Sequence, residues 1–583
     1  MKTLWKHAGW IGLLTIVPQL WLALGSPSDW SPAQLRNAGL LLLGNLALAL
    51  ALCLLLEVPT RRLPRRLEPV RPSLPLFFLL APQGLLFAHR FVSARRIGGS
   101  TRDATFVASL VAAAILALLL VLLVSRVGRF PHRRILAGSA VAGGLAVVFA
   151  QLIPSPARPQ APVERPNVLL VVLDALRPDA LGCYGNSFDV SPNIDRLAEE
   201  GMLFETAFSS SSSSVPGHAS LLFGCGVAEH GAPSNRSDLP TGMPPSLAAR
   251  MGESGYRSFG ICQNPLINAT AGFARGFDYY WSWAEGGRGA APWREALLAL
   301  PVVELLIKIA DVEPISLRAS LHFERREPWF GFVQLLYTHD PYIDADRWAT
   351  PARVAAIRTR LEDGRLRNTT DYTDDEIAGF IAKYYGSIAY SDRLLHELLT
   401  KMDEETRTNT VIILCSDHGE TLAEHGHEGV GKHFGYHNAS LRVPLIVHDP
   451  RKPQGRRVSA LTGLDRVADI ALAFAQGTEG GLPEQVAKRE HVIFSAPYLI
   501  AVNDSLKVVL HSQKLDDGPT VYRWREDSYD ESPTTHDSLP TVIDLTESLR
   551  AAWEKIEPHY RPTADEDLRP EKLERLKALG YVD

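Results

Sequence analysis

The sequence predicts an α/β protein in which N-terminal transmembrane helices precede a mostly parallel sheet sandwiched between helices. Residues 1–153 are apolar stretches separated by short arginine-rich loops, whereas the chain after Pro154 has an ordinary globular composition. In residues 166–475, apolar β-branched runs alternate with helix-like stretches, the pattern of a parallel sheet covered by helices on both faces. This alternation weakens in residues 476–583, which predicts a small C-terminal α+β subdomain built against the main sheet.

Five apolar segments predict the membrane region. Two of them, 38–57 and 104–125, are long and uncharged enough to cross a hydrocarbon layer about 30 Å thick, which needs roughly 20 apolar residues. A lone short segment would instead indicate a buried core helix, but five in succession favour membrane helices. Whether 74–89 fully spans stays open. The segments lie at about 8–25, 38–57, 74–89, 104–125 and 136–153.

The loop charges predict the orientation in the membrane. Basic residues precede the first segment and fill the second and fourth loops, which share one side if five helices span. The positive-inside rule makes that side cytoplasmic and places the globular part outside, in a multi-pass inner or plasma membrane protein. Four arginines of the third loop favour the alternative, four spans with a cytoplasmic globular part: Arg90, Arg95, Arg96 and Arg102.

The globular part follows a proline-rich linker, residues 154–165, that reads as a semi-rigid spacer. Its elements are predicted from hydrophobic patterning and from turn residues. The predicted strands are VLLVVL (168–173), a strand ending the helix–strand stretch 246–262, WFGFVQLLYTHD (329–340), TVIILC (410–415), HVIFS (491–495) and LKVVLHS (506–512). The predicted helices include Ser191–Gly201, 384–399 and a terminal one at 571–580.

Charge and cysteine content narrow the possibilities further. The chain has 60 Lys and Arg against 65 Asp and Glu, a net charge of −5, so it has no basic excess that would indicate nucleic acid binding. Cys53 and Cys415 lie in apolar runs, which predicts that they are buried. The other three cysteines could include one disulfide in an oxidising compartment, with the pairing left open: Cys183, Cys225 and Cys262.

Polar side chains follow two of the predicted strands. Asp174 follows VLLVVL, and Asp417 and His418 follow TVIILC, so they belong to the sheet edge where ligands bind in open α/β folds. Ser214 precedes the Pro-Gly turn of SVPGHASLLFG, at the start of a predicted helix. Four ligands of mixed oxygen and nitrogen character suit zinc or manganese better than calcium, with magnesium also possible. A metal bound to the Ser214 oxygen would lower its pKa and activate it as a nucleophile.

Several motifs follow one another from Arg165 to about Pro450: PNVLLVVLDALRPDALGCYG, SPNIDRLAEEG, SVPGHASLLFG, GYRSFGICQNP with GFARGFDYY, HDPY, SDHGETLAEHG and LRVPLIV. In these motifs and in their order, the chain resembles the sulfatase branch of the alkaline phosphatase superfamily. The closing LKALGYV is similar to the tail of many members. The resemblance implies a sulfatase-like fold and a metal-dependent enzyme that hydrolyses or transfers phosphate or sulfate esters.

The resemblance also implies a role for individual residues. His218 stands where sulfatases carry arginine, and His339 matches a histidine that contacts the transferred group or its leaving oxygen. Ser214 matches the nucleophile. The metal-ligand positions fall on Asp174, Ser214, Asp417 and His418, and substrate-binding positions on Lys432 and His433, with His437 less favoured.

Two departures from the family pattern bear on the nucleophile. Sulfatases that use formylglycine carry a C/S-x-P-x-R pattern, in which His218 here replaces the arginine, and a second aspartate after the first strand is replaced by Ala175. Both changes resemble membrane-bound phosphoethanolamine transferases and lipoteichoic acid synthases, which use an unmodified Ser or Thr. Asp340 and Asp344 lack a histidine at the spacing that a second metal needs, so one ion is expected.

Three functions are therefore compatible with the sequence. The first is a membrane-anchored, metal-dependent enzyme that forms a phosphoseryl intermediate at Ser214, acting on a lipid head group or an envelope glycan. The second is a sulfate-ester hydrolase in which Ser214 becomes formylglycine. The third is an inactive sulfatase-like membrane sensor or scaffold. The retention of all four candidate metal ligands disfavours it.

Overall fold

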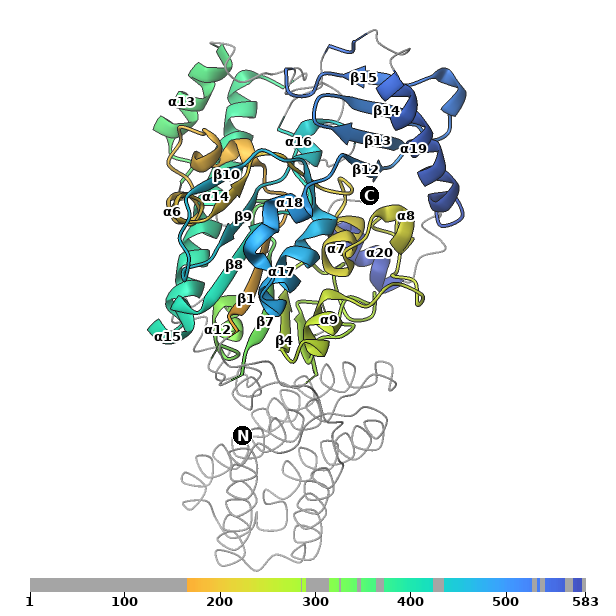
Figure 1. Ribbon diagram of the computed structural model, residues 1–583. Helices are drawn as coiled ribbons and strands as arrows, with labels where there is room; N and C mark the ends of the chain where they lie inside the picture. The colour runs from red at the N-terminus through yellow and green to blue at the C-terminus, as the bar shows by residue number, and fades with distance from the viewer. Residues whose placement is uncertain are drawn as a thin grey trace, which may run out of the picture. The chain divides into compact units, whose positions relative to one another are not determined.

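The computed structural model describes most of the chain from Arg165 onward (Figure 1). The predicted membrane segments of residues 1–153 and most of the linker lie outside the described residues, as do Lys432 and His433. Among the described helices, none combines the length and apolar character that crossing a bilayer requires. The described ranges are 165–284, 286–289, 314–323, 327–342, 348–362, 372–422, 435–526, 532–534, 540–560 and 570–578.

Almost all described residues belong to one compact unit, Arg158–Gly286 with Ile315–Asp583. The strands are β1 (Asn167–Leu173), β2 (Met202–Phe204), β3 (Ala207–Phe208), β4 (Arg257–Cys262), β5 (Tyr279–Ser282), β6 (Gly286–Gly289), β7 (Trp329–Leu335), β8 (Thr410–Cys415), β9 (Leu445–His448), β10 (Arg456–Val458), β11 (Thr462–Gly463), β12 (Glu490–Ser495), β13 (Tyr498–Asn503), β14 (Lys507–His511) and β15 (Thr520–Tyr522). The helices are α6 (Pro192–Glu200), α7 (Ser214–Phe223), α8 (Val227–His230), α9 (Leu247–Glu253), α12 (Pro314–Ser320), α13 (Pro351–Glu362), α14 (Asp374–Thr400), α15 (Glu404–Thr408), α16 (Asn438–Leu441), α17 (Val467–Gln476), α18 (Leu482–Val486), α19 (Pro540–Ile556) and α20 (Pro570–Ala578).

The main sheet confirms the predicted α/β fold with a mostly parallel sheet. Within the compact unit its order is β10-β2-β9-β8-β1-β7-β4-β5. The strands β8, β1, β7, β4 and β5 run parallel, and β9 is antiparallel to both of its neighbours. All seven residues of β1, NVLLVVL, are buried, as expected for a central strand that is covered on both faces. The sheet therefore delivers the segments after β1, β7 and β8 to one edge.

Helices pack on the apolar faces of this sheet. Alternate residues of β1, Val168, Leu170 and Val172, share one hydrophobic core with apolar residues of α7, α9 and α17, and α17 lies in front of β1 in Figure 1. Elsewhere α6 packs against β9, and the 27-residue α14 packs against α6. The helix predicted over Ser191–Gly201 is α6, which begins at Pro192 as the proline at its first position favours.

The C-terminal region forms a four-stranded antiparallel sheet in the order β12-β13-β14-β15. Its two faces are both buried, as the alternation of side chains in a strand allows. Phe494, Leu499 and Leu510 pack with apolar residues of α19. Ile493, Ile500 and Val509 on the other face pack with Phe208 and Leu441, which precede the candidate nucleophile and end α16. The C-terminal sheet is thus joined to the segments that carry the site.

The cysteines correct one expectation from the sequence. Cys183, Cys225 and Cys262 are all free thiols, so the disulfide considered for them is wrong. Cys262 is buried at the end of β4, where its sulfur donates to the Gln334 side chain at 3.3 Å. Cys415 is buried in β8, as its apolar surroundings predicted.

Two glycines allow backbone segments to approach the end of β8. A Cβ on Gly217 of α7 would lie 2.6 Å from the Asp417 carbonyl oxygen, and one on Gly419 would collide with the Ala439 carbonyl oxygen. Neither neighbour is the flexible end of a side chain, so the backbone itself would have to move. α7 and α16 consequently lie close to Asp417 and His418 only because these positions lack side chains.

We expect Gly217→Ala to lower the free energy of unfolding by about 1–3 kcal/mol, because overpacking forces α7 away from Asp417. Gly379→Ala is the matched control, since a Cβ in the middle of α14 meets nothing within 4 Å. That control should raise the stability by about 0.5–1 kcal/mol through helix propensity. Denaturant unfolding of both variants measures the difference. A Gly217→Ala variant as stable as the parent would contradict the close approach.

Candidate metal centre and nucleophile

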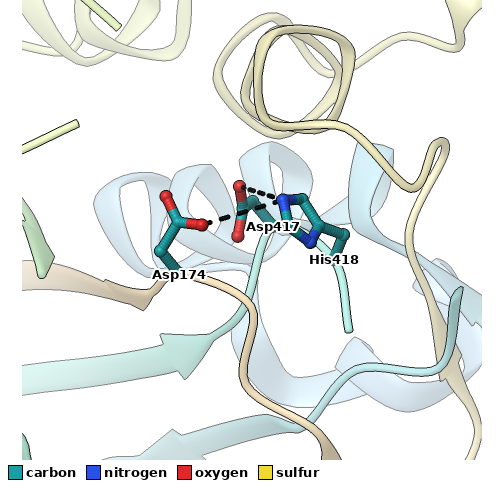
Figure 2. Close-up of side chains that lie close together, drawn as sticks. All are labelled: Asp174, Asp417 and His418. Atoms are coloured by element: carbon teal, nitrogen blue, oxygen red, sulfur yellow. Dashed lines mark ion pairs between the residues drawn. The ribbon is translucent and has the colours of Figure 1, made fainter. Parts of the chain in front are cut away.

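Two neighbouring parallel strands position three candidate metal ligands. β1 pairs with β8 with Val172 opposite Cys415, so Asp174 and the Asp417–His418 pair leave the sheet side by side. Figure 2 shows their side chains converging, with both carboxylates directed at the imidazole. All three residues are fully buried. The predicted convergence of strand ends is therefore what brings residues more than two hundred positions apart into one cluster.

The imidazole of His418 presents one nitrogen to this cluster. Its Nδ1 lies 2.8 Å from the Gly419 carbonyl oxygen, an acceptor that requires the proton on Nδ1. Its Nε2 lies 3.7 Å from Asp174 Oδ1 and 3.4 Å from Asp417 Oδ2. A backbone partner that fixes the tautomer in this way leaves Nε2 available as a metal ligand.

The electrostatics of the cluster call for a cation. Asp174 Oδ1 and Asp417 Oδ2 have no hydrogen-bond partner among the described residues. Burial and then the Asp417 charge raise the pKa of Asp174. Burial would also raise the pKa of Asp417, but the imidazoles of His418 and His218 outweigh it and lower that pKa. Two buried carboxylates are costly to hold charged together unless a cation compensates them.

The donor set fits a divalent metal ion. One ligand atom each from Asp174, Asp417 and His418 lie within 4.8 Å of one another. Mixed carboxylate and imidazole ligands suit zinc or manganese, and the two carboxylate oxygens without partners are those that would bind it.

Two amide side chains that were not identified from the sequence donate hydrogen bonds to the Asp174 carboxylate. Asn264 Nδ2 and Gln334 Nε2 each donate to Asp174 Oδ2 at 2.8 Å, which leaves Oδ1 for the ion. Gln334 interrupts the apolar strand WFGFVQL, and this buried polar residue was the available signal. On the other carboxylate, the Ala175 amide donates to Asp417 Oδ1 at 3.2 Å.

Ser214 begins helix α7, as predicted, and lies beside the cluster. Its Oγ is 3.2 Å from His418 Nε2, and its side chain is fully buried. The next amide, of Val215, donates to Asn235 Oδ1 at 2.9 Å. Asn235 is a third amide side chain that the sequence did not reveal, and its Nδ2 has no hydrogen-bond partner in the described part of the chain. The candidate nucleophile lies at the N-terminus of α7, which is the positive end of the helix dipole.

His218 lies one turn further along α7 and contacts both halves of the site. Its Nδ1 is 2.9 Å from the Ser214 carbonyl oxygen and 3.3 Å from Asp417 Oδ2. Burial lowers the pKa of His218, but the Asp417 carboxylate more than compensates and the pKa is raised. His218 therefore connects α7, the helix that begins at Ser214, to the candidate metal ligand Asp417.

His339 follows β7 on the third neighbouring strand. Its Nδ1 donates to the Asp340 carbonyl oxygen at 2.6 Å, and its ring centroid is 6.4 Å from that of His418. Burial lowers the pKa of His339, but Asp174 and Glu420 outweigh this and raise it. The turn is closed by Tyr342, which has a positive φ of 53°, a conformation that non-glycine residues adopt where surrounding contacts enforce it.

Glu420 is a further buried acid that the sequence did not single out. Its Oε2 accepts from the Tyr342 hydroxyl at 3.2 Å and its Oε1 from the Thr421 amide at 3.1 Å. Burial raises its pKa to about 7. Glu420 therefore links the segment after His418 to the turn that carries His339.

The predicted substrate-binding residues are only partly placed. Lys432 and His433 lie outside the described residues. His437 is buried at the N-cap position of α16, where its ring packs on Tyr436 with centroids 4.3 Å apart. The structure thus brings Asp174, Ser214, His218, His339, Asp417 and His418 together at one edge of the sheet.

A buried carboxylate and imidazole cluster beside a serine at a helix N-terminus is the arrangement of a metal-dependent hydrolytic enzyme. The Sulfatase family profile matches residues 166–477, more than half of the chain. The chain therefore belongs to the sulfatase family, and it is an ester hydrolase of the alkaline phosphatase superfamily.

Relatives agree with this assignment. An arylsulfatase of Clostridium perfringens is 24% identical over 347 residues, which covers 49% of this chain and 69% of that protein. The multifunctional alkaline phosphatase superfamily protein PehA of Trinickia caryophylli is 24% identical over 354 residues, with 49% and 68% covered. The fold, and the fold alone, is also similar to that of a solved structure from work on glycosaminoglycan metabolism by Bacteroides thetaiotaomicron, with a TM-score of 0.50 at 17% identity, covering 67% of this chain and 100% of that one.

We expect Asp417→Asn to abolish retention of a divalent ion, because the substitution removes one of the two charges that bind it. Asn264→Ala removes the hydrogen bond to Asp174, together with the acceptor of the Leu266 amide, and should weaken metal affinity about tenfold to a hundredfold. Elemental analysis of the purified protein, with competition by a chelator, measures both. Asn193→Ala is the control, since its amide bonds to Asp392 instead. Equal metal retention in the parent and in Asp417→Asn would contradict the assigned centre.

Proposed function

We propose that the protein is a metal-dependent hydrolase or transferase of phosphate esters that uses Ser214, as translated, for nucleophilic attack. The observation that carries this proposal is the position of Ser214 Oγ, 3.2 Å from His418 Nε2 at the first residue of α7. The two carboxylate oxygens without partners belong to the same cluster. A metal bound by Asp174, Asp417 and His418 would lower the pKa of the serine hydroxyl and offset negative charge.

The residues around Ser214 suggest how the reaction proceeds. Ser214 first gives its hydroxyl proton to solvent, because its pKa is lowered. The ionised serine oxygen forms a bond to phosphorus while the bond from phosphorus to the ester oxygen breaks. The leaving oxygen takes a proton from His339, which lies on the neighbouring strand end. Water or an acceptor hydroxyl then attacks phosphorus and gives its proton to His339. The bond from phosphorus to the Ser214 oxygen breaks, which leaves that oxygen ionised as before. Fixed donors such as the α7 N-terminus stabilise the charge that develops, which is the main requirement of phosphoryl transfer.

The environment of His218 supports a serine that stays unmodified. This imidazole replaces the arginine of the C/S-x-P-x-R pattern, and it is fully buried against the Ser214 carbonyl oxygen and Asp417. Its role inside the fold accounts for the residue at this position. A phosphoryl acceptor oxygen is already present in serine, so no formylglycine is needed for the first step.

A formylglycine-dependent sulfatase is the second candidate. The relative named an arylsulfatase favours it, because the same ligands would hold the ion beside a modified Ser214. A scaffold without activity is disfavoured, since two carboxylates buried side by side carry an electrostatic cost that a bound cation would offset.

The apolar N-terminal segments suggest where the enzyme works. Residues 1–153 contain five such segments, and the loop charges favour a catalytic domain outside the cytoplasm. We therefore propose a membrane-anchored enzyme whose substrate is a lipid head group or an envelope glycan. Protease protection in intact and permeabilised cells tests the location of the domain.

We expect peptide mass spectrometry to show unmodified serine at position 214, and Ser214→Ala to lower kcat/KM for phosphate esters by at least about a thousandfold. Ser213→Ala should change it little, because that N-cap side chain makes no capping hydrogen bond. Parallel assays with aryl phosphate, phosphodiester and aryl sulfate identify the preferred ester. Formylglycine at this position together with preferred sulfate turnover would establish the sulfatase candidate instead.

We expect His339→Asn to impair esters with poor leaving groups most, because they depend on protonation of the departing oxygen. The loss in kcat/KM should be about 10²–10⁴-fold for alkyl esters and much smaller for nitrophenyl esters. His448→Asn is the control, because His448 lies at the end of β9 and pairs with Glu200 of α6. A loss of equal size for both ester classes would exclude His339 as the general acid.

A further inference from the structure

Lys507, the first residue of β14, is a fully buried lysine outside the candidate site. Its Nζ donates to the Tyr436 carbonyl oxygen at 2.9 Å and to Asn438 Oδ1 at 3.3 Å. The same nitrogen lies 5.8 Å from the Tyr436 ring centroid and 5.2 Å from that of Tyr522. The ammonium group is therefore enclosed by aromatic rings and oxygens of another segment.

Burying this ammonium group is costly unless its partners compensate the lost hydration. Carbonyl and amide oxygens and two aromatic faces do so here, and cation–π contact is strongest where water is excluded. The next three residues of β14, Val508, Val509 and Leu510, are apolar and buried. An apolar residue at 507 would thus complete the strand, and the lysine instead ties β14 to residues 436–438.

The segment that Lys507 holds supports both halves of the candidate site. We call residues 435–442 the α16 segment. Its carbonyl oxygens at Ser440 and Ala439 accept from the amides of Gly419 and Glu420 at 2.8 and 3.0 Å, directly after His418. Its Leu441 carbonyl oxygen accepts from the Ser209 amide at 2.8 Å. Ser209 is the first of the six consecutive serines at 209–214, which we call the serine run.

The C-terminal sheet also contacts the serine run directly. Ser212 and Ser495 share a hydrogen bond of 2.5 Å, and Ser495 in turn donates to the Gly435 carbonyl oxygen at 2.6 Å. The Phe494 amide donates to the Ser210 carbonyl oxygen at 3.0 Å. Residues from β12 and β14 thus hold the α16 segment and the serine run against each other.

We propose that Lys507 is a positioning residue of the active site, acting on His418 and Ser214 through the α16 segment. The proposal rests on the proposed function for the roles of those two residues. Lys507 touches neither of them, so its removal changes their placement and leaves their chemistry intact. The four-stranded C-terminal sheet accordingly contributes to the geometry of the active site.

The test compares Lys507→Met with the parent in the full-length protein. Methionine keeps the volume of the side chain but removes the charge and the donors. We expect kcat to fall roughly tenfold to a hundredfold, the loss expected for hydrogen bonds to a charged group, with KM changed by less than about threefold. Lys507→Arg retains charge and donors and should recover part of the lost rate.

Hydrogen exchange separates positioning from a general loss of stability. In Lys507→Met, the amides of Ser209, Gly419 and Glu420 should exchange faster, while those of β1 keep their protection. Ser512→Ala, after the end of β14, is the control, because this buried hydroxyl has no hydrogen-bond partner in the described chain. Exchange that rises uniformly, or an unchanged kcat, overturns the proposal.

A second variant covers the case in which Lys507→Met does not fold. Asn438→Ala removes one acceptor of Lys507 from the opposite side, and it should produce the same local change in exchange and the same kcat loss. If the parent turns over no ester, the proposed function fails. The exchange pattern still decides whether Lys507 fixes the α16 segment, because it does not depend on activity.

Discussion

The burial of two carboxylates around one imidazole nitrogen is the constraint on which the rest of the structure depends. Asp174 and Asp417 each have one oxygen satisfied by amides and one oxygen that faces His418 without a hydrogen-bond partner among the described residues. Burial raises the pKa of Asp174, and a cation bound beside both carboxylates would offset the cost of keeping them charged. The parallel sheet brings the two carboxylates together, because β1 and β8 are neighbours and end at the same edge.

The candidate nucleophile, Ser214, is positioned by the close approach of the α7 backbone to that of Asp417. Gly217 allows α7 to lie against the Asp417 carbonyl oxygen, and His218 links the Ser214 carbonyl oxygen to the Asp417 carboxylate. These contacts hold Ser214 next to Asp417, a candidate metal ligand. A helix that only presented its N-terminus would favour an anion, but it would not fix the distance from the serine oxygen to His418.

The sequence was sufficient for what depends on strand order and chain direction. Asp174, Asp417 and His418 follow strongly apolar runs, and Ser214 precedes a helix, so their convergence could be predicted from the fold class. Asn264, Gln334, Asn235 and Glu420 could not, because a single amide or acid has no pattern until its partner in space is known. The disulfide that the sequence left possible is absent among Cys183, Cys225 and Cys262 for the same reason, since the spacing of thiols in the chain does not give their distance in the fold.

The C-terminal sheet contributes contacts to the site that neither sequence patterning nor the family match predicts. The family match stops at residue 477, yet Lys507, Ser495 and Phe494 beyond it hold the α16 segment and the serine run. Short antiparallel strands give a weak alternation, which suggested a small subdomain built against the main sheet. One face of this sheet is buried under α19 and the other packs against Phe208 and Leu441, which belong to the segments around the site. The geometry of the catalytic site thus depends on residues that neither patterning nor family resemblance assigns to it.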